Sequence, residues 1–258
     1  MVTQEQLDFY EEKGYLQIEG LLESDFLSEL QNKSSKLIKT LQKEAPLPQK
    51  GVLRHAVFRE SVPKGKDFKE GAVYGVMDLQ DHDPVYTKLL FYDPLILSIK
   101  EVLGTSLKLH HTRLISKESE LNNSISTGAD FGMHQDYPFF PHRDHSTLAA
   151  WMPLIDTSIE NGALHVVPGS HKLGPIEHLG SSEKGFRLNP DEWSVSKGIP
   201  IIAKAGDVIL FNYLVIHGSN QNKSYERRTS LIYQFNASTD EPLNTAHHDS
   251  SGNGMQLM

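Results

Sequence analysis

The stretch IPIIAKAGDVILF, residues 199–211, is rich in β-branched side chains on either side of an Ala-Gly-Asp turn. This composition is typical of strands joined by tight turns. Four further segments of the same kind also lie after residue 104, separated by Gly, Pro and Asn: residues 107–116, 147–155, 163–170 and 229–236. This part of the chain is therefore predicted to form a β-sandwich or barrel.

Two connections between these segments carry information of their own. Asn161-Gly162 lies between two of them, and because a type I′ turn needs positive φ at both central positions, it predicts a two-residue hairpin. Residues 174–200 form a long connection for a compact β domain, and loops of that size are usually functional or mobile.

The N-terminal part of the chain is predicted to be mostly helical. Thr3 and Gln6 form a capping-box pattern, and Gly14 is placed to end that helix. A short strand is expected at residues 15–20. Apolar residues at helical spacing then predict an amphipathic helix over residues 24–43, whose apolar face would cover a sheet.

Residues 44–80 mix Pro, Gly, Lys and His with short apolar pieces, which predicts long loops or irregular strands rather than a regular element. Asp83-Pro84 and Asp93-Pro94 each place an N-cap residue before a proline at the first helical position. The second of these helices is expected to end at Gly104.

The chain of 258 residues has the size of one domain with elaborations. We expect a single domain over residues 1–258, in which residues 1–104 pack on the sheet, residues 105–240 form the β core and residues 241–258 form a tail.

Composition and charge limit the kinds of partner and metal ligand that can be expected. The net charge is −8 and the 25 basic residues form no run of five or more, so neither nucleic acid nor an anionic membrane is expected as a partner. There is no cysteine, so any metal must be bound through nitrogen and oxygen. The first residues lack the pattern of a signal peptide, and no apolar run is long enough to span a bilayer. We expect a cytoplasmic protein that acts on a small molecule, with its oligomeric state open.

The segment FGMHQDYPFFPHR, residues 131–143, carries the first candidate site. One residue separates His134 from Asp136, so on an extended strand both side chains would point to the same face. His217 ends another predicted strand and supplies a third candidate ligand. Two histidines and one carboxylate leave open positions on a metal, which suits a non-haem iron(II) oxygenase.

Arg228 follows His217 by eleven residues, with Ser230 close behind. A planar guanidinium beside a hydroxyl is suited to the distal carboxylate of a dicarboxylic keto acid.

These residues lie in a set of motifs that resembles the phytanoyl-CoA dioxygenase family of iron(II) and 2-oxoglutarate oxygenases over nearly the whole chain. The motifs are GYLQIEGLL (14–22), HTRLISK (111–117), MHQDYPFFPHR (133–143), WMPLIDTSIENGALHVVPGSHK (151–172), AGDVILFN (205–212), HGS (217–219) and RRTSLIYQF (227–235).

The resemblance implies an α+β protein whose core is a double-stranded β-helix, a cupin-like jelly roll with flanking helices. It implies that Fe(2+), 2-oxoglutarate and O2 are used to hydroxylate a small organic substrate, with desaturation or ring chemistry as the other outcomes, while 2-oxoglutarate is converted to succinate and CO2. It also implies that Trp151 lies beside the co-substrate and that Arg113 or a neighbour lines the pocket. Some relatives use a lysine for the co-substrate where this chain has VYGVMDLQ, residues 73–80. Either Tyr74 or a residue of the opposite strand takes that place, or the bond is absent.

Other interpretations of the same residues remain. A jelly-roll protein could bind metal and ligand without oxygenase activity, and a cupin-like metal-dependent hydrolase or isomerase would work without O2. Trp151 could be an ordinary core residue, and Arg228 could form a surface ion pair with Glu226. The side chains that select the substrate are expected within residues 51–61 and 174–200.

Overall fold

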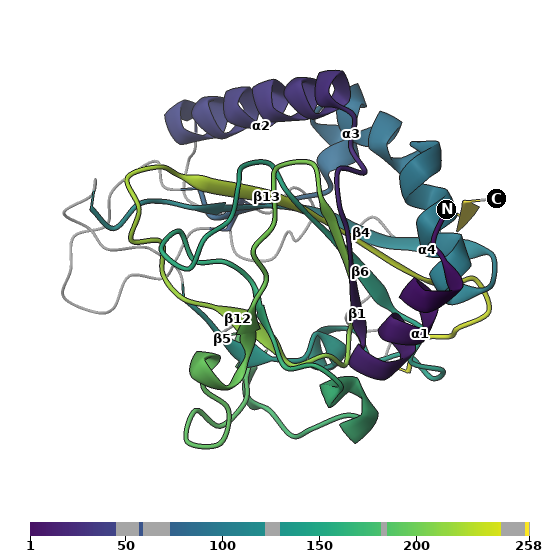
Figure 1. Cartoon of the computed structure of the whole chain (residues 1–258). Coiled ribbons are helices and arrows are strands. Elements are labelled where there is room, and N and C mark those ends of the chain that lie inside the picture. The colour runs from purple at the N-terminus through teal and green to yellow at the C-terminus, as the bar shows by residue number, and fades with distance from the viewer. Residues whose placement is uncertain (45–56, 59–72, 122–129, 182–184, 244–255, 258) are drawn as a thin grey trace.

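Two antiparallel sheets form the core of the protein. The computed structural model describes residues 1–44, 57–58, 73–121, 130–181, 185–243 and 256–257. Within these ranges an eight-stranded sheet faces a four-stranded one, and a two-stranded hairpin lies apart from both. Figure 1 shows the long helix α2 across the outer side of the large sheet, with β5 and β12 on the opposite side. The predicted fold class, mainly β with flanking helices, is confirmed.

The strands of the large sheet, in spatial order, are β1 (Tyr15–Ile18), β11 (Val208–Asn212), β6 (Leu148–Pro153), β13 (Arg228–Ala237), β4 (Leu107–Lys117), β3 (Gly75–Met77) and β2 (Val57–Phe58), and β14 (Gln256–Leu257) also pairs with β4. The small sheet consists of β10 (Ile199–Pro200), β7 (His165–Val166), β12 (His217–Ser219) and β5 (Phe131–His134), and the separate hairpin of β8 (Leu179–Ser181) and β9 (Gly185–Arg187). The α-helices are α1 (Gln4–Lys13), α2 (Ser24–Glu44), α3 (Pro84–Leu90) and α4 (Asp93–Leu103). The 3-10 helices are η1 (Leu79–Asp81), η2 (Tyr137–Phe139), η3 (Ser170–Leu173) and η4 (Val195–Lys197).

The predicted N-terminal elements are confirmed. The Thr3 hydroxyl accepts a bond from the Gln6 amide, and the Gln6 side chain accepts one from the Thr3 amide, which completes the capping box of α1. Gly14 ends the helix at φ 79°, a left-handed conformation that favours glycine. Because the chain turns there, β1 can pair with β11 at the edge of the large sheet.

The two Asp-Pro pairs behave differently. The Asp83 side chain accepts a bond from the Val85 amide and caps α3 as predicted. The prediction that Asp93 caps the next helix is wrong, because Tyr92 is the N-cap of α4 and its carbonyl accepts the first helical bonds. Asp93 lies in the first helical turn, where its negative charge faces the positive end of the helix dipole. Gly104 ends α4, as predicted.

The larger core lies between the helices and the outer face of the large sheet. Side chains on α2, α3 and α4 pack against every second residue of the central strands, because alternate residues of a strand point to one face. The fully buried members include Leu30, Leu89, Ile99, Leu231 and Tyr233. The opposite, inner face is thereby free to line the space between the two sheets. None of the helices in the described ranges has the length and apolarity needed to cross a bilayer.

The hairpin predicted at Asn161-Gly162 is wrong. The flanking strands β6 and β7 belong to different sheets, and of the two residues only Gly162 has positive φ. The Asn161 side chain instead accepts a bond from the Ser158 amide and donates one to the Asp156 carbonyl, which builds a longer turn. This turn carries the chain from one sheet to the other, and it presents the Gly162 carbonyl to Arg228.

The long connection predicted over residues 174–200 contains β8, β9, η4 and β10 within its described part. Of residues 51–61, only 57 and 58 are described, as strand β2 paired with β3.

Candidate metal centre and co-substrate pocket

Strand pairing in the small sheet brings the two histidines together. His134 is the last residue of β5 and His217 the first of β12, and the two are direct partners in the antiparallel register. Both rings point between the sheets, with their centroids 4.3 Å apart.

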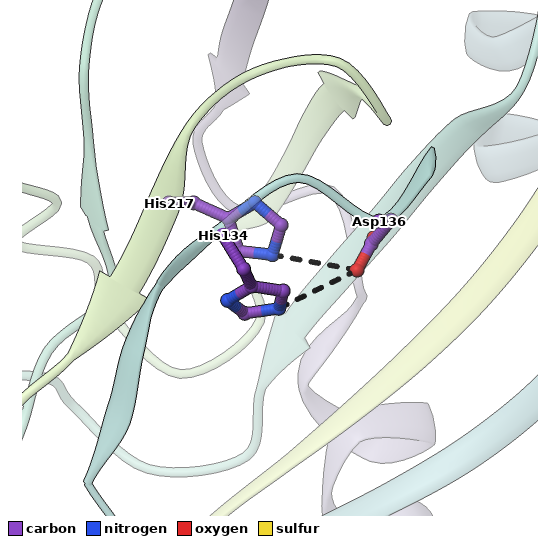
Figure 2. A group of neighbouring side chains, drawn as sticks. All are labelled: His134, Asp136 and His217. Atoms are coloured by element: carbon purple, nitrogen blue, oxygen red, sulfur yellow. Dashed lines mark ion pairs between the residues drawn. The ribbon is translucent and has the colours of Figure 1, made fainter. Parts of the chain in front are cut away.

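Asp136 reaches the same point by a different route from the predicted one. Strand β5 ends at His134, and Asp136 has φ −73° and ψ −19°, so the expectation of an extended strand through Asp136 is wrong. The chain turns there because the Asp136 amide donates to the Tyr213 carbonyl and η2 begins at the next residue. The Asp136 Oδ1 atom nevertheless lies 3.6 Å from the Nε2 atoms of both His134 and His217. Dashed lines mark these two contacts in Figure 2.

The backbone and a glutamine orient these three side chains. The Nδ1 atom of His134 lies 2.8 Å from the Gly132 carbonyl, and that of His217 lies 2.9 Å from the Val215 carbonyl. A proton on Nδ1 leaves each Nε2 as an acceptor that faces Asp136. Gln234 on β13 donates its Nε2–H to Asp136 Oδ2 at 2.7 Å. One oxygen of Asp136 is thus held by the large sheet while the other faces the histidines.

The charge states suit a cation. Burial alone would raise the pKa of Asp136, but the neighbouring His217 and His134 hold that pKa at about 2. Burial, together with His134, lowers the pKa of His217 to about 4. At neutral pH the group therefore presents an ionised carboxylate and a neutral imidazole, the forms that bind a metal. The ligand atoms of His134, Asp136 and His217 lie within 4.8 Å of one another, so this trio could hold one ion.

The inner face of the large sheet carries the other candidates. Arg228, Ser230 and Gln234 alternate along β13 on this face, and Trp151 of β6 lies opposite the residue between them, Ile232. The Arg228 guanidinium is 2% exposed, stands 5.5 Å over the Trp151 ring and donates to the Gly162 carbonyl at 3.1 Å. Among the described residues, the buried Arg228 Nε and Ser230 Oγ find no hydrogen-bond partner. Such atoms are expected where a polar ligand binds.

The alternative of a surface ion pair between Arg228 and Glu226 does not fit this burial. Arg227, one residue earlier, forms an ion pair with Glu118 at 2.7 Å instead.

Arg113 lies on β4, where it pairs with Ile232. Burial lowers its pKa, and the charge of Asp136 opposes that effect, so Arg113 lies toward the metal end of the inner face. Gly75 pairs with Ile115, and the Ser116 amide donates to the Tyr74 carbonyl. Because residues of β4 point alternately to its two faces, Lys117 shares the inner face with Arg113. Tyr74 lies beside Ser116, which points to the opposite face, so Tyr74 does not lie on the inner face.

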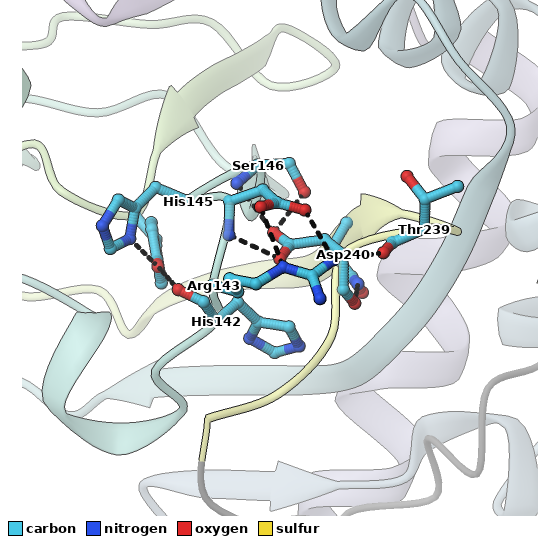
Figure 3. Close-up of polar contacts among 9 residues, drawn as sticks. His142, Arg143, His145, Ser146, Thr239 and Asp240 are labelled. Atoms are coloured by element: carbon cyan, nitrogen blue, oxygen red, sulfur yellow. Dashed lines mark hydrogen bonds and ion pairs between the residues drawn. The ribbon is translucent and has the colours of Figure 1, made fainter.

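A carboxylate from the C-terminal part clamps the segment that follows the first two ligands. Asp240, which has 0% exposure, accepts bonds from the Asp144 amide and from both the amide and the hydroxyl of Ser146 (Figure 3). Between them His145 adopts φ 54°, and its Nδ1 lies 2.7 Å from the Tyr213 hydroxyl. The Tyr213 carbonyl binds the Asp136 amide, so the clamp supports the turn that carries Asp136.

Three residues near the candidate ligands were not identified from the sequence. These are Gln234, which binds Asp136, His111, which pairs with Gln234 across β13 and β4, and Lys117, which pairs with Arg228. Their spacing along β4 and β13 follows strand alternation, but only the register between the two strands shows that they face the site.

Comparison with known proteins shows a family match and several similar proteins. Residues 10–230 match the family described as phytanoyl-CoA dioxygenase (PhyH). The human peroxisomal phytanoyl-CoA dioxygenase (Homo sapiens) is 29% identical over 249 residues, which cover 93% of this chain and 70% of that protein. A probable alpha-ketoglutarate-dependent hypophosphite dioxygenase from Stutzerimonas stutzeri is 31% identical over 151 residues, which cover 56% of this chain and 50% of that protein.

Solved structures share the fold. The epimerase SnoN, in complex with Fe3+, alpha ketoglutarate and nogalamycin RO, superposes with a TM-score of 0.70 at 20% identity, over 99% of this chain and 95% of that one. EctD from S. alaskensis with bound Fe superposes with a TM-score of 0.71 at 19% identity, over 93% of this chain and 79% of that one. The predicted jelly roll is thereby confirmed. Since the family match spans most of the chain, this protein belongs to the phytanoyl-CoA dioxygenase family.

Proposed function

We propose that this protein is an Fe(II)- and 2-oxoglutarate-dependent dioxygenase that hydroxylates a small organic substrate. In this proposal His134, Asp136 and His217 bind the iron, and Arg228 with Ser230 binds the distal carboxylate of 2-oxoglutarate. Trp151 walls the co-substrate and Arg113 lines the pocket near the metal. The family membership and the iron and alpha ketoglutarate named for the structural neighbours support this assignment.

The single observation that carries the proposal is the convergence of the three candidate ligands. Two imidazole Nε2 atoms lie at the same 3.6 Å from one carboxylate oxygen, and the remote atom of each side chain is already bonded to the protein. Two histidines and one carboxylate on one side of a metal leave the other side open for co-substrate and O2.

When bound, iron and 2-oxoglutarate would supply the oxidation, in which the keto acid becomes succinate and CO2 and the substrate gains oxygen. The protein's own residues supply position and shielding. Gln234 fixes the plane of the Asp136 carboxylate, and the Phe211 ring packs 4.8 Å from the His217 ring on the inner side of the site. In this proposal the buried Trp151 keeps water from the side of the bound co-substrate that leads to Arg228.

The test is co-substrate turnover. Purified protein with Fe(II), 2-oxoglutarate and air is expected to form succinate slowly even without its substrate, and to form none under nitrogen. Iron binding without 2-oxoglutarate binding would favour a binding protein, and turnover without O2 would favour a hydrolase or isomerase. A screen of cell metabolites for a gain of one oxygen atom would then identify the substrate.

A further inference from the structure

Two buried cations face each other across neighbouring strands at the end of the inner face remote from Gln234. Lys117 of β4 and Arg228 of β13 are direct partners in the antiparallel register. Lys117 has 0% exposure and Arg228 2%. Both side chains reach from the large sheet toward the small one, because the Lys117 ammonium lies 5.1 Å from the Phe131 ring of β5 and donates to the Asn220 carbonyl just beyond β12.

Neither cation is neutralised by a carboxylate of the described residues. No ion pair found there includes Lys117 or Arg228, and their bonds go to the neutral carbonyls of Asn220 and Gly162. Burial lowers the pKa of Lys117 well below its usual value, the charge of Arg228 lowers it further, and Asp130 opposes both effects. Burying two adjacent cations costs desolvation free energy and brings like charges together, unless an anion binds to both of them.

The surroundings select the kind of anion. Between the two cations and the candidate iron ligands, β13 carries Ser230 and Ile232 on this face, and Trp151 and Arg113 lie opposite Ile232 on the neighbouring strands. A ligand that spans this face must therefore be anionic at its far end, to pair with Lys117 and Arg228, and able to bind metal at its near end. A dicarboxylic keto acid has this pattern, whereas a keto acid without the second carboxylate would leave both cations buried and unpaired.

We propose that Lys117 is a second cationic ligand of the distal carboxylate, acting with Arg228 to select dicarboxylic over monocarboxylic keto acids. This inference rests on the proposed function. It also assigns a lysine to the co-substrate in a chain that lacks one within residues 73–80. The lysine comes from the strand that pairs with β3, at the position where a carboxylate can contact an ammonium and a guanidinium together.

Binding of two keto acids to the anaerobic Fe(II) protein tests this role. We would titrate 2-oxoglutarate and 2-oxopentanoate, which has the same carbon chain without the distal carboxylate, and follow the visible absorption band of the Fe(II)–keto acid complex. Lys117→Met is expected to raise the Kd for 2-oxoglutarate by about 10- to 100-fold and to leave that for 2-oxopentanoate unchanged. Lys117→Arg should restore most of the preference. Lys108→Met, on the same strand but only half-buried, should leave both Kd values unchanged.

An unchanged Kd for 2-oxoglutarate in Lys117→Met, or equal losses for both keto acids, would overturn the inference. If Lys117→Met does not fold, the keto acid preference of Arg228→Met tests the inference instead. With Lys117 still in contact with the carboxylate, that variant keeps a preference for 2-oxoglutarate of about tenfold, whereas with Arg228 as the sole cation it binds the two keto acids alike. A wild-type protein that binds iron but gives no band with either keto acid would instead refute the proposed function.

Discussion

Asp136 divides its two oxygens between two tasks. Oδ1 faces the histidines, and Oδ2 accepts the bond from Gln234. The depressed pKa of about 2 means that the carboxylate is ionised at any pH at which the protein would work. A residue of this kind fixes both the charge and the geometry of a metal site.

Asp136→Ala is expected to abolish succinate formation and to lower iron affinity by about 100-fold or more, because one of three ligands and its charge are lost. Calorimetric titration with Fe(II) under nitrogen, together with a succinate assay, measures both effects. Asp144→Ala is the matched control, since that carboxylate is 51% exposed. Turnover of Asp136→Ala at the wild-type rate would contradict the ligand assignment.

Gln234→Leu tests the orientation of the carboxylate. The substitution keeps the volume of the side chain but leaves Asp136 Oδ2 buried without its donor. We expect iron affinity to fall by about 10- to 100-fold, while the Kd for 2-oxoglutarate, measured at saturating iron, changes little. Gln234→Glu, which places a second carboxylate beside that of Asp136, should lower iron affinity further than Gln234→Leu does. Wild-type iron affinity in Gln234→Leu would show that the bond does not position Asp136.

At the scale of elements, the site depends on a contact between segments far apart in the chain. The turn at residues 142–146 follows the first two candidate ligands, and the Asp240 carboxylate holds this turn by accepting three hydrogen bonds from it (Figure 3). The Arg143 amide and the Leu243 amide add backbone bonds to Glu241 and Pro141. Residues beyond β13 therefore complete the support of the candidate metal site.

Asp240→Ala is expected to lower the free energy of unfolding by about 2–4 kcal/mol, because three donors lose a buried acceptor. Urea denaturation followed by circular dichroism measures the loss. Glu241→Ala, an exposed neighbour whose backbone carbonyl makes the contact, should change stability by less than about 0.5 kcal/mol. Equal stability of the two variants would mean that the clamp contributes nothing.

At the scale of the whole molecule, an ion at the candidate site would connect the two sheets. His134 and His217 come from the small sheet, whereas Gln234 of the large sheet holds Asp136. Binding to the folded state alone stabilises it in proportion to the logarithm of ligand concentration.

Mn(II) or Fe(II) at 100 times its Kd should therefore stabilise the protein by about 2.7 kcal/mol and raise Tm by about 5–10 °C. Anaerobic differential scanning calorimetry measures the shift, and a chelator should reverse it. Asp136→Ala should show no comparable rise. The same rise in that variant would place the metal elsewhere.

Much of the architecture could be predicted because its signals are local. Thr3 with Gln6 and Gly14 defined α1, Gly104 ended α4, and the β-rich segments after Gly104 became the strands of the two sheets. Predictions failed where local preference met tertiary context. Asn161-Gly162 lies in a turn between sheets rather than in a hairpin, and Asp93 lies inside its helix. The single-domain organisation and the cytoplasmic location remain predictions.

The sequence alone shows which donor types this chain offers, namely two imidazoles, a carboxylate and a late arginine, and it places most of the described strands after Gly104. Tertiary structure alone decided that His217 lies opposite His134, that Asp136 reaches them from a turn, and that Gln234 and Lys117 face the same interior. The physical reason is register. Side-chain alternation can be read along one strand, but which residues of distant strands meet depends on their pairing, and a shift of one residue would turn every side chain to the other face.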